Sequence, residues 1–151
     1  MRVYLVIMDE TEESRVALRF ATRRAAKTQG GVHILALVPR QPFSAFGGIQ
    51  ATIEEEARDR AEVVATAAAG SVLSEAGQMP VISVETGDAV KIVREYLSQH
   101  GEVAALVLGA STDGGPGPLV AHFAGAGLGG LPCPLFIIPG GMSEAEIDRL
   151  S

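Results

Sequence analysis

The stretch Val103–Gly125, with the sequence VAALVLGASTDGGPGPLVAHFAG, decides how this chain folds. It opens with an unbroken apolar run, Val103–Leu108, which has the length of one strand buried on both faces. From Gly109 the residues become small, polar and rich in glycine, and a helical pattern starts near Pro118 or Leu119. A strand, a glycine-rich turn and a helix together present backbone N–H groups and a positive helix end to an anion. If the chain binds a small molecule, we expect the site here.

Apolar runs and helical patterns alternate along the whole chain. Apolar runs predict further strands at Val3–Met8, Val32–Val38, Pro80–Thr86 and Leu135–Ile138. Apolar residues at helical spacing predict helices over about residues 12–28, 51–76, 88–99, 119–128 and 143–150. Strands that alternate with helices form a parallel sheet with right-handed crossovers. The sequence therefore predicts one α/β domain over residues 1–151, an open, doubly wound parallel sheet of five strands with helices on both faces and an extra C-terminal helix.

Several helix ends carry recognisable signals. Thr11, or Asp9 itself, can cap the first predicted helix, and the pair Gly30-Gly31 is expected to end it. Ser143 and Glu146 have the spacing of a capping box at the start of the last helix.

Two segments indicate which parts of the predicted fold are exposed to solvent and which are covered. Pro80–Thr86 alternates between apolar and polar residues, which is typical of an edge strand with one wetter face. The loop Pro39–Gln50 contains Phe43 and Phe46, and exposure of both rings would be unfavourable. We therefore expect this loop to fold over another part of the molecule.

The charge balance argues against a nucleic-acid surface. The formal net charge is −6, and the two lysines lie far apart in the sequence. Binding to phosphate backbones needs clustered cations. The nearest approach to a cluster lies on the first predicted helix beside two glutamates, where a solvated helix face is expected; its members are Arg15, Arg19, Arg23 and Arg24.

Other common kinds of site have little support. The single cysteine, Cys133, excludes an internal disulfide and a multi-cysteine metal site. His33 and His100 have positions typical of structural residues, and His122 has no metal-ligand partner at suitable spacing. We expect no metal site and no catalytic triad. No signal peptide is visible, and no apolar stretch reaches the roughly 20 residues of a membrane helix, so a soluble, cytoplasmic protein is expected.

Two features compete for the ligand position of such a sheet. Ligands bind beyond the carboxyl ends of parallel strands, at the point where the strand order reverses. Asp9 follows the first strand, and Gly109–Gly117 follows the fourth. If these strands are neighbours, both features converge on one crevice. Asp9 could equally serve as a helix cap, and the glycines could serve only a tight turn and close helix packing.

The chain resembles the universal stress protein family over nearly its whole length. The segments that carry the resemblance are VIMDETEES (6–14), HILALV (33–38), TGDAVKIV (86–93), AALVLGAS (104–111) and LPCPLFIIPG (131–140). The resemblance implies the strand order 3-2-1-4-5, which makes strands one and four neighbours. It also implies a homodimer formed through the last strand, Leu135–Ile138. Some members bind ATP or AMP through a loop of pattern G-x2-G-x9-G-(S/T), whereas others bind no nucleotide.

The resemblance also implies particular site residues. Asp9 would lie beside the nucleotide, Val38 would line the adenine pocket, and Gly109 would be the first glycine of the motif. Thr112 stands where the second glycine belongs, a G-x9-G spacing runs instead from Gly115 to Gly125, and Ala126 replaces the hydroxyl residue. The complete set of expected site residues is Met8, Asp9, Val38, Leu108, Gly109, Ser111, Gly115, Gly125, Ala126 and Gly127.

The loop itself is poorly equipped for a triphosphate. Pro116 and Pro118 each remove an N–H donor, Asp113 adds a negative charge, and no Lys or Arg occurs from Gly109 to Pro139. The remaining donors are expected in the loop and at the turn 125–127. A triphosphate would need Mg²⁺ and helix dipoles for its neutralisation, so AMP would bind more easily.

Three hypotheses follow. The first is a homodimeric binding or signalling module with a degenerate adenine-nucleotide site. The second is a member that binds no nucleotide and acts only through contacts with an unknown protein partner. The third, a slow ATPase, has the least support because no base or lysine is placed to assist phosphoryl transfer.

Overall fold

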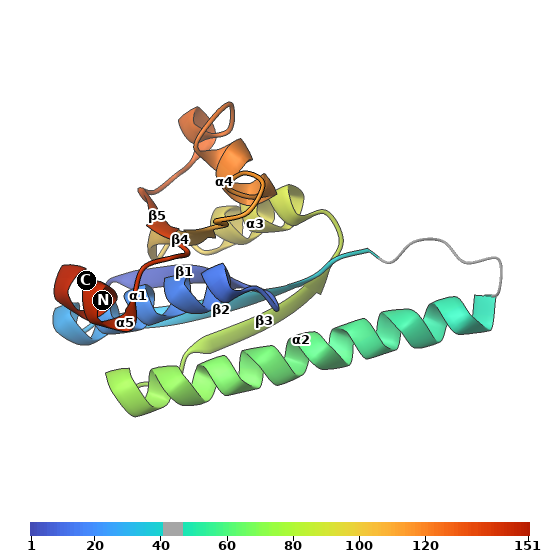
Figure 1. The fold of residues 1–151 in the computed structure, drawn as a ribbon, viewed down its shortest axis with the longest axis horizontal. Coiled ribbons are helices and arrows are strands. Elements are labelled where there is room, and N and C mark those ends of the chain that lie inside the picture. The colour runs from blue at the N-terminus through green and yellow to red at the C-terminus, as the bar shows by residue number, and fades with distance from the viewer. Residues whose placement is uncertain (41–46) are drawn as a thin grey trace.

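The computed structural model describes residues 1–40 and 47–151 of the chain. The elements, in order, are β1 (Val3–Met8), α1 (Glu12–Thr28), β2 (Gly31–Val38), α2 (Gly47–Ala76), β3 (Val81–Thr86), α3 (Ala89–Gln99), β4 (Val103–Ala110), α4 (Pro118–Phe123), the 3₁₀ helix η1 (Leu128–Gly130), β5 (Leu135–Pro139) and α5 (Glu144–Leu150). Every strand is followed by a helix, so the predicted alternation is confirmed (Figure 1). Among the helices of these ranges, none has both the length and the hydropathy of a membrane span.

The five strands form one parallel sheet in the order β3-β2-β1-β4-β5, as predicted. The strand β1 lies at the centre, and all of its residues are buried. Strand β3 lies at one edge, where Val81 and Ile82 are exposed. Strands β2 and β3 lie on one side of β1, and β4 and β5 lie on the other. The strand order therefore reverses between β1 and β4. Their carboxyl ends therefore open the crevice in which ligands of such sheets bind.

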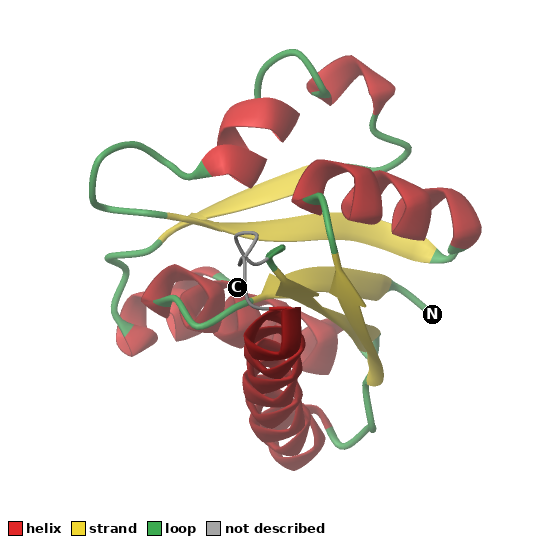
Figure 2. Cartoon of the chain, turned by 90° about the vertical axis from the view of Figure 1, so that its right-hand side faces the viewer, coloured by secondary structure: helices red, strands yellow, loops and turns green. Residues whose placement is uncertain are grey.

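Helices cover both faces of the sheet in two layers. Helices α1, α2 and α5 cover one face, and α3 and α4 cover the other (Figures 1 and 2). Side chains of β1 alternate between the two cores: Tyr4 and Val6 pack with α1 and α2, whereas Leu5 and Ile7 pack with α3 and α4. The period of two along the strand thus assigns each residue to a face.

The two ends of α1 show what the sequence predicted and what it did not. Thr11 is the N-cap, because its side-chain oxygen accepts a hydrogen bond from the N–H of Ser14 at 3.3 Å. At the other end the expected Gly-Gly stop is wrong, since Gln29 takes the left-handed conformation with φ of 54°. Gly30 serves a close approach instead, because a Cβ there would lie 2.3 Å from the carbonyl oxygen of Arg2.

The C-terminal helix α5 packs on α1 through the arginines that were expected to form a solvated face. Arg19 binds Asp148 through two hydrogen bonds, and Arg23 adds a contact of 3.4 Å to the same carboxylate. Ile147 is 1% exposed beneath them. The predicted capping box of Ser143 and Glu146 is confirmed. The solvated-face expectation was wrong for Arg19 because a local pattern of charges does not show which distant segment packs on it.

Three boundaries differ from the sequence prediction. Strand β4 continues to Ala110, so Gly109 belongs to the strand and not to the loop. The predicted helix over 119–128 is two elements, α4 and η1, separated by a turn. Helix α2 begins earlier, at Gly47, and extends beyond the sheet (Figure 1). The expectation for Phe43 and Phe46 concerns residues outside the described ranges.

Candidate functional site

A cavity of about 390 Å³ opens at the carboxyl ends of β1 and β4. It lies on the α3 and α4 side of the sheet. Its walls come from the ends of β1, β2 and β4, the start of α1 and the segment that leads into α4. The lining residues are Ile7, Asp9, Thr11, Glu13, Ser14, Leu37, Pro39, Arg40, Gly87, Ala89, Leu108, Gly109, Pro116, Gly117, Pro118, Leu119 and Val120. The two features that the sequence singled out, Asp9 and the segment after β4, therefore meet in one crevice.

Three of the expected site residues, Asp9, Leu108 and Gly109, line this crevice. Met8 and Val38 do not. Met8 belongs to the core on the α1 and α2 side, and Val38 is 2% exposed. Their neighbours Ile7 and Leu37 take the lining positions, because successive side chains of a strand point to opposite faces.

The glycines at the end of the predicted motif lie away from the crevice. The N–H groups of Gly125 and Gly127 donate to the carbonyl oxygen of His122 at 3.2 and 2.9 Å. Those two donors are therefore used inside the turn after α4. Ala126 belongs to the same turn.

The loop after β4 is also closed by its own hydrogen bonds. The N–H of Ser111 donates to the carbonyl oxygen of Pro116 at 3.1 Å, and the Ser111 hydroxyl bonds the backbone of Asp113. Gly114, Gly115 and Gly117 have φ of 67°, 109° and 97°. Because side chains are strained in this region, the glycines permit the turn by which the chain enters α4. Ser111 and Gly115 do not line the crevice, whereas Gly117 does.

Gly109 has a packing role that needs no ligand. A Cβ at this position would lie 2.0 Å from the carbonyl oxygen of Glu13 and 2.5 Å from its carbonyl carbon. The first turn of α1 thus rests directly on the backbone of β4. Gly140, which follows β5, makes a similar approach, since its Cβ would lie 2.9 Å from the Cβ of Glu13. These two glycines let the N-terminus of α1 lie beside the crevice.

The Asp9 carboxylate organises the turn into α1. Its Oδ1 accepts a hydrogen bond from the N–H of Thr11 at 2.8 Å and another from the Thr11 hydroxyl. The buried Ser14 hydroxyl contacts the carbonyl oxygens of Thr11 and Asp9 at 2.9 and 3.1 Å. Asp9 therefore holds the capping residue in place while it faces the crevice. Contact between Asp9 and a ligand stays a prediction.

Arg40 is the one cation among the described residues that line the crevice, and sequence reasoning missed it. Its side chain reaches Gly87, where an added Cβ would lie 3.8 Å from Nε. Asp9 and Glu13 add two negative charges to the lining. The strand order could have indicated Arg40, because the end of β2 lies beside the end of β1.

The histidines take part in other contacts. His122, on α4, lies 2.9 Å from Nη2 of Arg94, on α3. His33 is buried and bonds the Tyr96 hydroxyl through Nδ1 at 2.8 Å, and burial lowers the pKa of its ring. Within residues 1–40 and 47–151, no group of three or more His, Cys, Asp or Glu side chains is arranged to hold a metal ion. The crevice thus presents an apolar floor, two carboxylates and one guanidinium.

Comparison with known proteins assigns the fold and the family. The sequence model of the universal stress protein family matches residues 1–139. No curated protein sequence matches the chain significantly. The universal stress protein UspA of Lactobacillus plantarum is similar in structure, with a TM-score of 0.78 and 17% sequence identity over 91% of this chain and 97% of that one.

Two further solved structures contain nucleotides. A universal stress protein in complex with cAMP has a TM-score of 0.57 and 14% identity, covering 91% of this chain and 96% of that one. A universal stress protein family member of Arabidopsis thaliana with AMP bound has a TM-score of 0.54 and 13% identity, covering 92% of each chain. At these identities the likeness shows the fold alone. Since the family model spans nearly the whole sequence, the chain belongs to the universal stress protein family.

Proposed function

We propose that the chain is a binding or signalling module that holds an adenine nucleoside monophosphate in the crevice between β1 and β4. The observation that carries this proposal is the cavity of about 390 Å³ at the reversal of strand order. Its volume is within the range of small-ligand sites, and an apolar floor with a few polar groups is typical of them. The module acts by occupancy: a bound ligand orders the walls of the crevice and alters what the protein contacts.

The structural neighbours support a monophosphate ligand. One is a complex with cAMP, and another contains AMP. In this chain, Ile7, Leu37 and Leu108 provide the apolar surface on which a base would pack.

The charges of the crevice favour AMP or cAMP over ATP. Arg40 is opposed by Asp9 and Glu13, so a triphosphate would meet more negative than positive charge. A ligand with one phosphate group carries the least repulsion, and the guanidinium of Arg40 can offset it.

Self-association and location are further parts of the proposal. Strand β5 lies at an edge of the sheet, and Ile137 is 39% exposed. A second copy could pair with residues Leu135–Ile138, which would cover this edge. Sedimentation of a monomer at micromolar concentration would count against the homodimer. We place the protein in the cytoplasm.

A second candidate is a module that works only through a protein partner. The closed hydrogen bonds of the loop after β4 and the turn at 125–127 favour it, because they occupy donors that a phosphate would need.

Titration calorimetry of the nucleotide-free protein separates the two candidates. AMP, cAMP, adenosine and ATP would be added in turn, the last with and without Mg²⁺. Saturable binding of a monophosphate, tighter than that of ATP, is the expected result. A ligand at ~100 times its Kd should also stabilise the fold by about 2.7 kcal/mol. If no nucleotide gives heat or a thermal shift at millimolar concentration, the second candidate replaces the first.

A further inference from the structure

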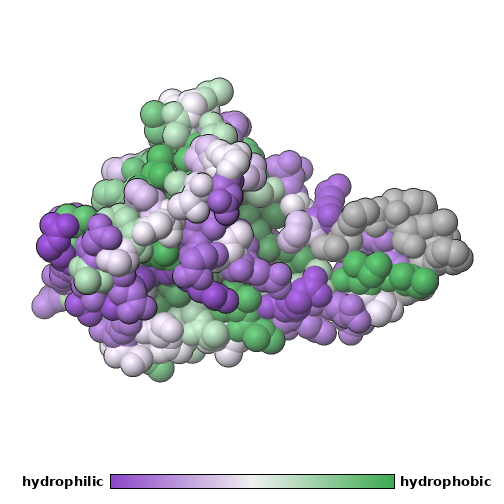
Figure 3. Space-filling model, in the orientation of Figure 1, coloured by the Kyte–Doolittle hydropathy of each residue, from purple (hydrophilic) through white to green (hydrophobic). Residues whose placement is uncertain are grey.

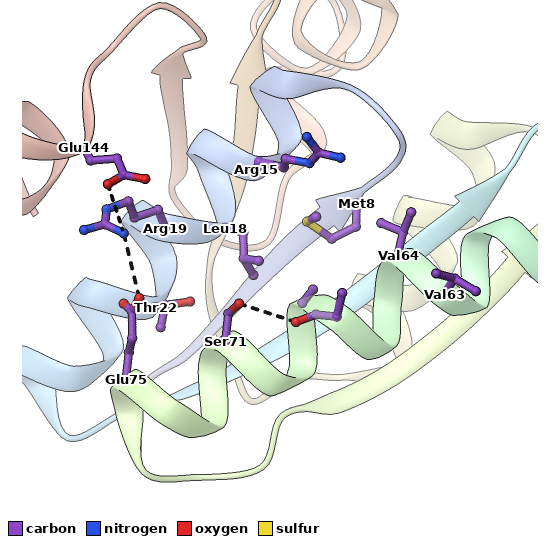
Figure 4. Close-up of a pocket in the computed structure, with 12 residues that line it drawn as sticks. Met8, Arg15, Leu18, Arg19, Thr22, Val63, Val64, Ser71, Glu75 and Glu144 are labelled. Atoms are coloured by element: carbon purple, nitrogen blue, oxygen red, sulfur yellow. Dashed lines mark hydrogen bonds and ion pairs between the residues drawn. The ribbon is translucent and has the colours of Figure 1, made fainter.

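A second cavity of about 390 Å³ lies on the other face of the sheet, between α1 and α2 (Figure 4). It shares no lining residue with the crevice between β1 and β4. Its lining residues are Met8, Arg15, Leu18, Arg19, Thr22, Val63, Val64, Ala67, Ala68, Ser71, Glu75 and Glu144. The two cavities are therefore distinct sites.

Small residues on α2 create this space. Where α2 faces α1 and the sheet, its buried residues are Ala65, Ala68, Ala69 and Val72. Leu18 and Met8 are the larger side chains at the floor, and Val63 at the mouth is 69% exposed. Exposed hydrophobic residues also interrupt the hydrophilic surface along α2 (Figure 3). The groove is thus apolar at its base and open at one side.

Thr22 places an unpartnered hydroxyl in the wall of this cavity. The residue is 2% exposed, and its Oγ1 has no hydrogen-bond partner among the described residues. Thr28, on the same helix, behaves as a helical threonine usually does and donates to the carbonyl oxygen of Arg24, four residues earlier, at 2.9 Å. Buried hydroxyl groups nearly always have a partner. The Thr22 oxygen has less than 1 Å² of accessible area, so a polar group in the cavity reaches it only when the side chain rotates about the Cα–Cβ bond.

The charges at the mouth are balanced within the protein. Arg19 is held by Asp148, with Glu75 and Glu144 at 3.8 and 3.9 Å from its Nη1. Arg15 pairs with Glu12 at 3.4 Å. A charged ligand would therefore meet both signs at close range, whereas an uncharged one would displace no ion pair.

We propose that this cavity binds a small uncharged amphiphile, a molecule with an aliphatic body and one hydroxyl or carbonyl group. The body packs on Leu18, Val64 and Ala68, and the polar group forms a hydrogen bond with Thr22. Glu144, at the start of α5, forms part of the mouth. This helix lies beyond the residues matched by the family model, which end at 139. The site is accordingly completed by a segment beyond the residues that the family model matches.

Hexan-1-ol is a suitable probe, with hexanoate and hexylammonium as charged probes of the same length. In an NMR titration of the ¹⁵N-labelled full chain, hexan-1-ol should shift the amides of Leu18, Thr22 and Ala68 saturably. The two ions should bind more weakly. Absence of saturable shifts, shifts confined to the crevice between β1 and β4, or tighter binding of either ion would each overturn the proposal.

Two variants test the contacts. Thr22→Val keeps the shape and removes the hydroxyl, so it should weaken hexan-1-ol binding about tenfold. Ala67→Phe, at an exposed position on the wall, should abolish binding by filling the groove. Thr28→Val is the matched control and should bind as the wild type does. Unchanged affinity in Thr22→Val would overturn the proposed contact.

Thermal unfolding checks the hydroxyl without any ligand. Because the Thr22 hydroxyl has no partner, Thr22→Val should melt at the wild-type temperature or above it, whereas Thr28→Val should melt lower. A lower melting temperature for Thr22→Val would show that its hydroxyl already has an internal partner, and it would overturn the proposal.

Discussion

Arg19 and Asp148 form a two-pronged ion pair, with Nε to Oδ1 at 3.0 Å and Nη2 to Oδ2 at 2.8 Å. The pair joins α1 to α5, and the hydrogen bond from Arg19 lowers the pKa of the Asp148 carboxyl. The side chains of Arg19 and Asp148 are 27% and 30% exposed. The pair fixes the C-terminal helix on the outer side of α1, beside the cavity that lies between α1 and α2.

Asp148→Asn should loosen α5 without unfolding the domain. The amide keeps the shape but loses the charge that Arg19, Arg23 and Lys27 share. Because partly exposed ion pairs contribute little, the melting temperature should fall by no more than about 4 °C. Hydrogen exchange of α5 amides should nevertheless accelerate, while that of β1 amides stays unchanged. Equal protection of α5 in both proteins would contradict the docking role.

Gly109→Ala should destabilise the protein strongly. The added methyl group would lie 2.0 Å from the backbone oxygen of Glu13, and backbone cannot move aside as a side chain can. Overpacking of this kind costs about 1–3 kcal/mol or more. Urea unfolding measures the difference. Gly101→Ala is the control, because nothing lies within 4 Å of a Cβ there, and it should have little effect.

If Gly109→Ala were as stable as Gly101→Ala, the close contact between α1 and β4 would be refuted. The presence of glycine at position 109 would then have to be explained by its place in the lining of the crevice alone.

The fold was predictable because its signals are local. Apolar runs and helical periodicity depend on neighbouring residues, and the resemblance supplied the strand order. The face to which each strand residue points was harder to predict. Met8 and Val38 were expected at the site, but the preceding residues, Ile7 and Leu37, lie there, because successive side chains of a strand point to opposite faces. Arg40 and the Arg19–Asp148 pair depend on packing between distant segments. No local pattern contains that information.

His33 should make stability depend on pH. Burial lowers the pKa of its ring below the ordinary value of 6.5; Glu102 partly opposes this, and His100 adds to it. The unfolded chain takes up a proton near pH 6.5, whereas the folded chain takes it up only at lower pH. The stability contributed by neutral His33 is therefore present above pH 6.5 and is lost as pH falls through the lowered pKa.

Melting temperatures between pH 7.5 and 5 would show this dependence. His33→Asn can keep a hydrogen bond to Tyr96 but does not titrate, so its pH profile should be flatter than that of the wild type. His122→Asn, at a half-buried site on α4 away from His33, is the control and should keep the wild-type slope. A ring titration of His33 centred above pH 6.5, measured by NMR, would reverse the expected sign.

Arg40→Ala should weaken binding of AMP or cAMP in the crevice about tenfold or more. Its guanidinium is the one positive group among the described lining residues, and a charge-assisted hydrogen bond contributes about 1.5–3 kcal/mol. Adenosine, which has no phosphate, should bind both proteins equally. Arg94→Ala removes a cation that lies beside His122 outside the crevice, so it should bind nucleotide as the wild type does. If Arg40→Ala and Arg94→Ala bind AMP equally well, the phosphate does not lie at the end of β2. A shift of the amides of Gly117 and Leu119 on AMP binding would then place it at the entry to α4, on the other wall of the same crevice.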